Sequence, residues 1–317
     1  MNTALTSNEI NVGVDISKLK LDIAIRPSGQ EFTVENNPDG IKSAIKMLKK
    51  VKPDRIVCEA TGRLEAPFIT ACRKAGFACV ISDPVRIKRF AGAIGKRAKT
   101  DKLDARLIAQ YAENIRPEPT AGKPETLNKI SDLLTRRNQL IEIRTQEKNR
   151  LQILPKEIGR TIKPIIDCID KQIDFIENCL ALAIAQSEDF EEKTRIIKSM
   201  PGVGNVVAYT LLADMPELGT ITNKQAASLV GVAPINRESG SFLGKRYIRG
   251  GRSKIRTAMY MAMMSAIQCN PLFKELYQRL VAAGKAKKAA IIACIRKMVV
   301  VLNSMVRNGR PWDPEMA

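Results

Sequence analysis

Four carboxylates stand at positions where acid chemistry is expected. Asp15 interrupts one apolar run and Glu59 ends a second, while Asp101 and Asp104 are three residues apart on an expected helix. Residues three apart share a helix face, so a helix over two adjacent strands would bring the four acids together. Clustered carboxylates repel one another unless divalent cations lie between them. Hard oxygen ligands suit Mg²⁺ or Mn²⁺, and two such ions about 4 Å apart promote in-line phosphoryl displacement.

Each of these acids also has a simpler interpretation. Asp15 could end a strand, and Glu59 could pair with a basic side chain. Asp101 could cap its helix, and Asp104 could be a solvated residue of the first helical turn. Three further carboxylates are expected to be turn residues: Asp22, Asp54 and Asp83.

The composition narrows the chemistry. The chain has 317 residues, with 52 Lys plus Arg against 33 Asp plus Glu, a formal net charge of +19 and no histidine. The missing histidine excludes a Ser-His-Asp or Cys-His nucleophile, a His-ligated zinc ion and a histidine base. The positive charge predicts a polyanionic partner, with nucleic acid ahead of an acidic membrane surface.

A second constellation of reactive side chains lies near the C-terminus. Segment 237–256 is expected to be a glycine-rich loop and carries Ser239, Ser241 and Ser253 among seven basic residues. Guanidinium groups stabilise the charge on a pentacoordinate phosphorus, which a serine hydroxyl can attack. The activating base would be a carboxylate of the first domain or a metal-bound hydroxide. The residues alone do not distinguish the three serines, because each could be a loop hydroxyl or a cap.

Two basic runs and one glycine motif predict contacts with nucleic-acid phosphates. The expected contacts in segment 84–106 are Arg86, Lys88, Arg89, Lys96, Arg97 and Lys99. Those in the C-terminal run are Arg237, Lys245, Arg246, Arg249, Arg252 and Lys254. Segment 199–204, Ser-Met-Pro-Gly-Val-Gly before an apolar helix, is typical of a helix-hairpin-helix element or of a plain glycine turn. In the former, Gly202 and Gly204 would let the backbone approach a phosphate.

The elements that must position these residues follow from the apolar pattern. Strands are expected at 10–16, 21–25, 31–34, 55–59 and 78–82, and helices at 41–51, 65–75 and 101–114. Three hairpin-like strands followed by alternating helices and strands predict a mixed α/β sheet.

The rest of the chain is expected to be helical. One helix is expected over 127–154, and a second carries an apolar seam at alternating spacings of three and four: Ile166, Ile169, Ile173, Ile176 and Leu180. Such a seam is typical of a coiled coil. A turn containing Pro155, Gly159 and Pro164 would join the two helices, as an antiparallel hairpin, an oligomerisation arm or a plain globular pair. An amphipathic helix at 285–305 is expected to pack on the C-terminal core.

The cysteines and the chain's apolar segments indicate a cytoplasmic location. Seven cysteines form no CxxC pair, which is typical of reduced and mostly buried thiols. The first residues lack the features of a signal peptide. Arg296 and Lys297 interrupt the most apolar late stretch, so no membrane-spanning helix is expected.

Three blocks of the first part carry a family resemblance. They are Gly-Val-Asp-Ile-Ser-Lys at 13–18, Cys-Glu-Ala-Thr-Gly at 58–62 and Lys-Thr-Asp-Lys-Leu-Asp-Ala at 99–105. In order, they resemble the N-terminal domain of the bacterial insertion-sequence transposase family one-hundred-ten, which includes the pilin-gene invertases. The Asn-Arg-Glu-Ser-Gly segment at 236–240 is similar to the C-terminal block of that family, and Pro-Trp-Asp at 311–313 to its usual terminus.

The resemblance implies a fold and a mechanism. It implies a RuvC-like, ribonuclease-H-type N-terminal domain in which Asp15, Glu59, Asp101 and Asp104 are the Asp-Glu-Asp-Asp metal site. It implies that Ser239 is the nucleophile that forms a phosphoserine link to a DNA end. The active site would combine the carboxylates of one subunit with the serine of another in a homo-oligomer, a dimer or tetramer. Donor and target DNA are the implied partners, together with a structured guide RNA.

The expected organisation is therefore a RuvC-like catalytic domain at 1–115, a helical coiled-coil region at 116–193 and a mainly helical transposase domain at 194–317. The expected function is site-specific recombination of an insertion sequence. Two other functions stay open, a metal-dependent Holliday-junction resolvase or nuclease that never uses the serine, and a non-catalytic nucleic-acid-binding scaffold. A membrane role is disfavoured because no amphipathic anchor with an aromatic belt is found.

Overall fold

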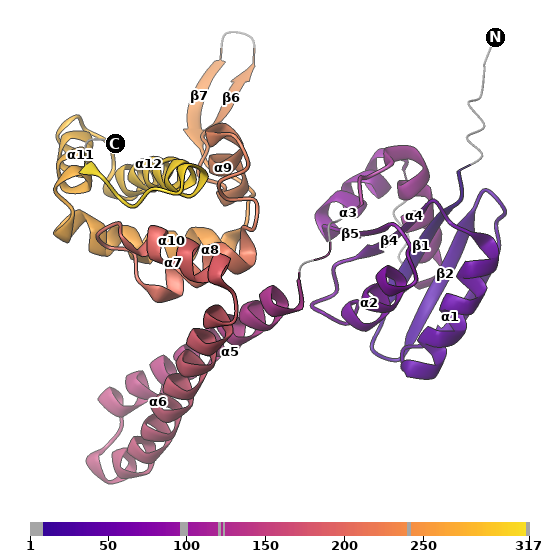
Figure 1. The fold of residues 1–317 in the computed structure, drawn as a ribbon, viewed down its shortest axis with the longest axis horizontal. Coiled ribbons are helices and arrows are strands. Elements are labelled where there is room, and N and C mark those ends of the chain that lie inside the picture. Colours follow the sequence, from indigo (N-terminus) through magenta and orange to yellow (C-terminus); the bar gives the residue numbers. More distant parts are fainter. Residues whose placement is uncertain (1–8, 96–100, 120–121, 123, 240–241, 315–317) are drawn as a thin grey trace. The chain divides into compact units, whose positions relative to one another are not determined.

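The computed structural model divides into two compact units, residues 1–122 and 123–317, each of which is described by itself (Figure 1). The structure describes residues 9–95, 101–119, 122, 124–239 and 242–314. Within these ranges, the side chains of 101–103, 237–239, 242–243 and 245 lie outside the description.

The first unit is built on a five-stranded mixed sheet with the strand order β3-β2-β1-β4-β5. Strands β1 (Asn11–Ile16), β2 (Lys20–Arg26) and β3 (Glu31–Glu35) form an antiparallel meander. Strands β4 (Arg55–Glu59) and β5 (Cys79–Ser82) continue the sheet in parallel with β1. The predicted mixed sheet is confirmed, and β4 has the predicted bounds.

Helices cover both faces of this sheet. Helices α1 (Pro38–Val51) and α2 (Ala66–Lys74) pack on the face that carries Val12, Val14 and Cys58. Helix α4 (Asp101–Ile115) packs on the opposite face, with α3 (Pro84–Ala93) beside it. Because alternate residues of a strand point to opposite faces, each buried strand contributes to two cores.

Helix α3 was not expected from the sequence. Its first residue is Pro84, and the carboxylate of Asp83 accepts a hydrogen bond from the backbone N–H of Val85 (2.8 Å). Proline is well suited to the first helical turn because its missing N–H would have no helical partner there. Pro84 therefore begins a helix instead of only ending the preceding strand.

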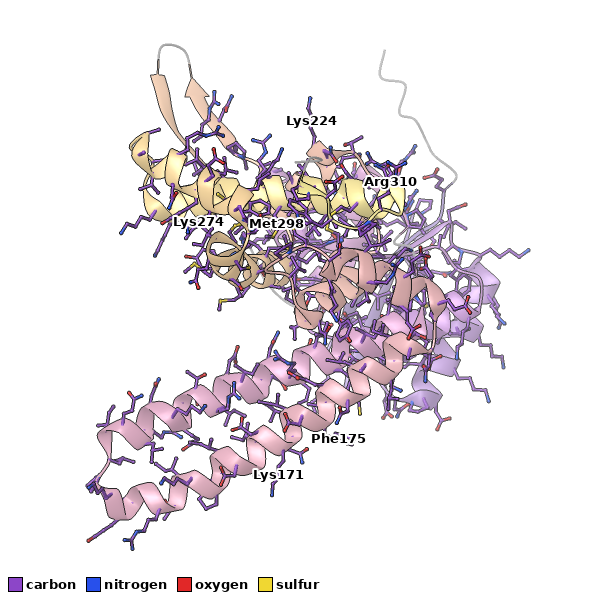
Figure 2. All side chains as sticks on the ribbon, turned by 60° about the vertical axis from the view of Figure 1, so that its left-hand side comes forward. Lys171, Phe175, Lys224, Lys274, Met298 and Arg310 are labelled. Carbon is purple, nitrogen blue, oxygen red and sulfur yellow. The ribbon has the colours of Figure 1, made fainter. Side chains whose placement is uncertain are left out.

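The second unit begins with two long antiparallel helices, α5 (Glu125–Ile153) and α6 (Lys156–Ala185). Ion pairs join them between Arg137 and Glu177 (2.7 Å) and between Arg144 and Asp170 (2.6 Å). The apolar seam of α6 is buried, whereas Figure 2 shows Lys171 and Phe175 on the side of α6 turned away from α5.

The predicted turn between these helices is wrong in extent. Only Leu154 and Pro155 lie between α5 and α6, and Gly159 and Pro164 are inside α6. Gly159 is buried, and an added Cβ would lie 3.1 Å from the Leu151 side chain, so this glycine serves close helix packing. Pro164 removes one helical hydrogen bond, but the buried seam on both sides of it continues the helix.

Shorter helices complete the second unit around one core. They are α7 (Glu188–Lys198), α8 (Asn205–Asp214), α9 (Asn223–Val230), α10 (Ser253–Cys269), α11 (Pro271–Ala282) and α12 (Lys287–Asn308). A two-stranded hairpin, β6 (Ile235–Ser239) and β7 (Phe242–Tyr247), lies between α9 and α10. The mostly helical character of this part is confirmed.

Two features near the C-terminus show how the core closes. Helix α12 is long and apolar enough to cross a membrane by length and composition, but 56% of its most apolar window is buried inside the protein. Trp312 stacks on Phe273 with 6.2 Å between ring centroids, and its backbone N–H donates to Ser199 Oγ (2.6 Å). The chain after α12 is thus anchored on the helical core.

Candidate functional site

Helix α4 lies directly on the middle of the sheet because small residues face each other there. A Cβ added at Gly13 of β1 would overlap the Ala109 backbone nitrogen and the Ala105 carbonyl oxygen, and would lie 2.8 Å from the Ala109 Cα. Ala24 of β2 packs against the same two alanines. The backbone of α4 therefore has one possible depth over β1 and β2.

The direction of α4 follows from its contacts. Glu113 near its end forms an ion pair with Arg26 at the end of β2 (2.6 Å). Ala105 near its start lies beside Asp22 near the beginning of β2. Because β2 is antiparallel to β1, the first turn of α4 lies over the carboxyl end of β1.

Three of the four predicted acids lie at this edge of the sheet, on the face that α4 covers. Asp15 is two residues after Gly13 and therefore faces α4. Glu59 is two residues after Val57, which packs against α4, at the end of a strand parallel to β1. Asp104 lies in the first turn of α4, and all three side chains are half-buried. Three separate elements thus direct carboxylates to one edge and one face.

Asp101, the fourth predicted acid, also lies on α4. Asp101 is the first residue of α4, one turn before Ala105, and its side chain lies outside the described residues. Among the side chains that are described, no three acids or thiols lie close enough together to form a ready metal cage. The donor set is nevertheless of hard carboxylate oxygens, which suits Mg²⁺ or Mn²⁺.

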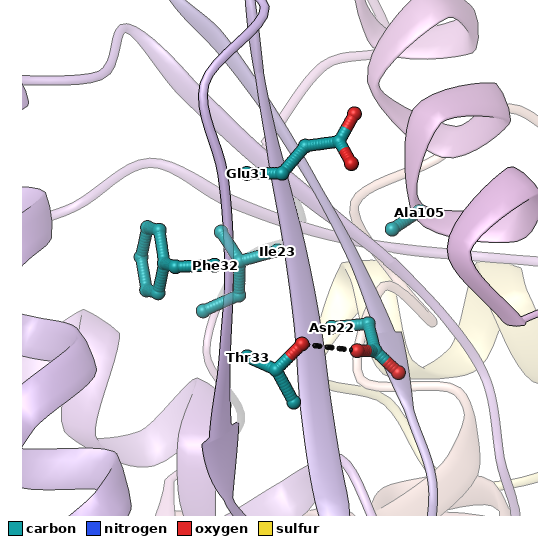
Figure 3. Close-up of a pocket in the computed structure, with 6 residues that line it drawn as sticks. All are labelled: Asp22, Ile23, Glu31, Phe32, Thr33 and Ala105. Carbon is teal, nitrogen blue, oxygen red and sulfur yellow. Dashed lines mark hydrogen bonds between the residues drawn. The ribbon is translucent and has the colours of Figure 1, made fainter.

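A fifth carboxylate, Asp22, also lies at this edge, so its expected place in a turn is wrong. Asp22 was expected to be a turn residue but lies in β2 as the register partner of Asp15, with 4% of its surface exposed. Its carboxylate accepts a hydrogen bond from Thr33 Oγ1 (2.5 Å) and pairs with Lys20 Nζ (3.1 Å). It borders a pocket of about 110 Å³ that Thr33, Glu31 and Ala105 also line (Figure 3). The sequence signal for this position was available, because Asp22 stands within the apolar run of β2, four residues before Arg26.

The other two acids expected in turns have structural roles. Asp54, just before β4, accepts a hydrogen bond from the backbone N–H of Ile10 (2.7 Å). Asp83 caps α3. Both predictions are confirmed in kind, since neither residue lies inside a strand or helix.

The first basic run supplies exposed cations. Arg86, Lys88 and Arg89 lie on α3 and are exposed to solvent. Helix α3 follows β5, whose carboxyl end lies at the same edge of the sheet as Glu59. The other three expected contacts, Lys96, Arg97 and Lys99, lie outside the described residues.

The glycine motif forms the turn between α7 and α8. Gly202 has φ +95° and packs on α10, where an added Cβ would lie 2.6 Å from the Ala266 Cα. Its lack of a side chain is therefore required by internal packing. Gly204 precedes α8 as its N-cap, is exposed and has open space at its Cβ position, so its backbone is the more accessible of the two glycines.

The serine segment is not the loop expected from its glycines. Ser239 is the last residue of β6 and pairs in register with Phe242 of β7, and Arg237 and Lys245 also lie in these strands. Antiparallel pairing of β6 with β7, with an irregularity between Ile235 and Arg237, places the segment in a hairpin despite its glycines. Ser241 lies outside the described residues, and Ser253 is the first residue of α10.

Two cations after the hairpin, Arg252 and Arg256, bind groups inside the protein. Arg252 makes a two-pronged ion pair with Glu217 (2.6 and 2.7 Å) and donates to the Asp214 carbonyl (2.8 Å), and its hydrogen bonds to Glu217 raise its pKa above the usual arginine value. Arg256 donates to the carbonyls of Val230 (3.1 Å) and Gly250 (2.7 Å). These groups hold the base of the hairpin.

The remaining cations of this run differ in exposure and partners. Lys254 Nζ donates to Thr135 Oγ1 of α5 (3.1 Å), so it is an internal contact as well as an exposed residue. Arg246 and Arg249 are exposed. The interpretation of Arg252 as a phosphate contact is weakened, because its guanidinium already binds a carboxylate in the geometry that would bind a phosphate.

The cysteines differ in burial, and burial keeps two of them protonated. Burial raises the pKa of Cys58 and of Cys294, so both remain neutral thiols near pH 7. Cys72 and Cys79 are also buried, whereas Cys168 and Cys269 are exposed and Cys179 is half-buried. All seven cysteines lie within the described residues, and each is a free thiol there.

Comparisons with known proteins cover nearly the whole chain. A transposase family model of the IS110 group matches residues 12–158, and a model described as the transposase IS116/IS110/IS902 family matches residues 194–278. The pilin gene-inverting protein of Moraxella bovis is 26% identical over 319 residues, covering 95% of this chain and 97% of that protein. A protein of insertion element IS110 from Streptomyces coelicolor is 23% identical, covering 82% of this chain and 84% of that protein.

Solved structures are also similar to part of the chain. The RuvC protein of Thermus thermophilus in complex with a Holliday junction substrate aligns with 35% of this chain and 99% of the RuvC chain, at 14% identity and a TM-score of 0.28.

The two transposase models together span most of the chain, including both the carboxylate edge and the serine hairpin. The chain therefore belongs to the IS110 family of transposases, enzymes that recombine the DNA of insertion sequences.

Proposed function

We propose that this transposase is a site-specific recombinase that cleaves and rejoins DNA strands with a carboxylate-bound metal site and a serine nucleophile. The observation that carries the proposal is the arrival of Asp15, Glu59 and Asp104 from three elements at one edge and one face of the sheet. Asp101, one turn before Ala105 on α4, would complete the set.

The carboxylates would hold Mg²⁺ or Mn²⁺, which, when bound, would stabilise the charge that develops on the phosphoryl oxygens. The residues fit such an ion because every donor is a hard oxygen, and because close packing at Gly13 holds the backbone of α4 against β1. The positive end of the α4 dipole favours ionised carboxylates in its first turn.

Ser239 would supply the nucleophile. Its Oγ would attack a DNA phosphorus, forming a phosphoserine bond as the bond from that phosphorus to one sugar oxygen breaks. The serine proton would go to a carboxylate base, and the departing sugar oxygen would take up a proton. Exposed Arg246 and Arg249 lie on or just after the strand next to it, where they could neutralise phosphate charge.

The proposal places the carboxylates of one subunit against the serine of another, so the working enzyme is a dimer or tetramer. Strand exchange would then pass through a Holliday-type junction between donor and target DNA. A structured guide RNA encoded by the element would pair with both DNAs, while Lys and Arg bind the backbones. The enzyme would act in the cytoplasm.

Mixing two inactive variants tests the composite site. Asp15→Asn and Ser239→Ala should each abolish strand transfer on donor and target DNA, and a mixture of the two proteins should recover part of the activity. Asp54→Asn is the matched control, because Asp54 lies at the opposite end of β4 and should leave the activity intact.

Other outcomes identify the alternatives. If Ser239→Ala keeps full strand transfer while Asp15→Asn loses it, the protein is a metal-dependent junction resolvase or nuclease. If loss of all four acids leaves recombination intact, the protein is a nucleic-acid-binding scaffold. Failure of the mixture to recover, with both single variants inactive, would contradict the composite site.

A further inference from the structure

The loop that follows β4 leaves the sheet at the acidic edge. It runs from Ala60 to Leu64, directly after Glu59, and ends at Glu65, the residue before α2. Whatever this loop presents is therefore next to a proposed metal ligand. Its sequence, Ala-Thr-Gly-Arg-Leu, contains one cation, Arg63.

A single buried carboxylate holds this loop. Glu65 is 9% exposed, and its Oε2 accepts hydrogen bonds from the backbone N–H of Thr61 (3.2 Å), the hydroxyl of Thr61 (2.9 Å) and the backbone N–H of Arg63 (2.9 Å). Three donors on one carboxylate oxygen fix both ends of a short turn. Hydrogen bonds to an ionised acceptor are stronger than neutral ones, so the turn has a defined shape.

That shape forces Arg63 into an unfavourable backbone conformation. Arg63 has φ +92° and follows Gly62 at φ +68°. A side chain with a Cβ rarely adopts this region, and such residues gather at functional sites when the surrounding structure enforces them. Glycine at position 63 would remove the strain, so an arginine at this position indicates a role for its exposed side chain.

The charges around the edge indicate the ligand of that side chain. Lys18 lies in the turn after β1 and Arg86 on the helix after β5, so exposed cations follow three neighbouring strands at the end where the carboxylates converge. Cations beside a carboxylate centre suit a DNA backbone. One phosphate group would lie at the acids while the adjacent phosphate groups of the same strand bind the cations. Arginine binds phosphate through two parallel N–H groups.

We propose that Arg63 binds a DNA phosphate beside the carboxylate centre and that Glu65 is the positioning residue that holds it there. The inference rests on the proposed function, because the phosphate is that of the DNA strand to be cut. Arg63 would be a substrate-binding residue, and Glu65 would act only through the loop.

The first test separates the charge of Arg63 from its backbone strain. Binding of Arg63→Gly to a synthetic four-way DNA junction is measured in EDTA over a range of salt concentrations. Loss of one phosphate contact should reduce the slope of log K against log salt by about 0.9. The melting temperature should stay equal or rise, because the strained conformation suits glycine.

Lys52→Gly is the matched control. Lys52 is also an exposed cation in the left-handed region, with φ +53°, but it caps α1 before the opposite end of β4. Its replacement should leave the slope of log K unchanged. An unchanged slope in Arg63→Gly, or an equal reduction in both variants, would overturn the assignment of Arg63.

The second test concerns Glu65. Glu65→Gln weakens the charged acceptor and should also reduce the slope, but it should add nothing when combined with Arg63→Gly. If Glu65→Gln reduces the slope equally with and without Arg63, it acts through general structure and not through Arg63, and its positioning role is wrong.

These tests do not depend on cleavage, so their failure differs from failure of the proposed function. If Glu59→Gln and Asp15→Asn still cleave DNA, the metal-carboxylate mechanism fails whatever the slope shows. If those variants are inactive and the Arg63→Gly slope is unchanged, only the phosphate contact is wrong.

Discussion

The two regions that carry the proposed chemistry are built in opposite ways. The carboxylates are at the edge of a five-stranded sheet whose central strand touches the α4 backbone at Gly13. Ser239 is on a two-stranded hairpin whose base is tied to the helical core by Arg252 and Arg256. In the first region, a glycine without a side chain lets helix and sheet pack closely. In the second, charged side chains hold the hairpin to the core.

This difference changes the meaning of the two basic runs. They look alike in sequence, yet α3 exposes Arg86, Lys88 and Arg89 to solvent, whereas Arg252 and Arg256 bind groups of the protein itself. A dense run of cations therefore indicates phosphate binding only for those side chains that the fold leaves accessible.

The largest expected effect is on the close packing of the first region. Gly13→Ala should lower the free energy of unfolding of the first unit by more than about 4 kcal/mol, because the new Cβ overlaps the α4 backbone. Denaturation followed by circular dichroism should show loss of one transition. Gly92→Ala, at an exposed helical position with open space at its Cβ, should be neutral or slightly stabilising. Equal effects of the two substitutions would contradict the packing argument.

The next effect concerns the charged anchor of the hairpin. Arg252→Ala should destabilise the second unit by about 2 kcal/mol, because Glu217 loses a two-pronged, charge-assisted partner. Arg252→Lys should recover only part of the loss, since an ammonium group cannot reproduce the fork. Thermal unfolding measures both. A lysine variant as stable as the parent protein would argue against the geometry of this pair.

A smaller effect should distinguish accessible from internal cations. Arg86→Ala should leave the melting temperature within about 1 °C, since surface substitutions change stability little, but should reduce the slope of log K against log salt for DNA binding by about 0.9. Arg252→Ala should lower the melting temperature but leave the slope of log K against log salt unchanged. Should both variants reduce the slope equally, the distinction between the two runs would not hold.

The smallest effect comes from a buried thiol of the second unit. Burial raises the pKa of Cys294 to about 11, so the folded state favours the neutral thiol. Its contribution to stability is complete below the unfolded pKa near 9 and is lost as the pH rises towards 11. Unfolding free energies measured from pH 8 to 11 should fall more steeply, by of order 1 kcal/mol, in the parent protein than in Cys294→Ala.

The sequence allowed most of the first unit to be predicted because its strands are short apolar runs with clear ends. β1, β2 and β4 were found within one residue of their bounds. Errors arose where one residue type has two uses. Segment 84–106 was interpreted only as a basic run although Pro84 opens α3, and Pro164 as a turn residue although it lies in α6. Only tertiary packing decides between such uses.

The candidate site was predicted as residues but not as an arrangement. The spacing of Asp15, Glu59 and Asp104 suggested that they lie close together, yet the close approach of α4 to the sheet depends on Gly13 and Ala105, which have no reactive side chain. Ser239 was expected in a loop because glycines surround it, whereas strand pairing with Phe242 governs its position. The hydrogen bonds of Asp22 and Glu65 were not predicted, because they join side chains of different strands or a side chain to backbone N–H groups.

The contact of Gly13 and Ala24 with Ala105 and Ala109 has a consequence for variation in this protein. In a library of variants selected for recombination, these four positions should tolerate almost no enlargement, even though none of them can donate a proton, bind a cation or touch DNA. Exposed Leu19, which is close in sequence to Asp15, should vary freely. Intolerance to substitution would then mark the support of the reactive centre as clearly as the centre itself.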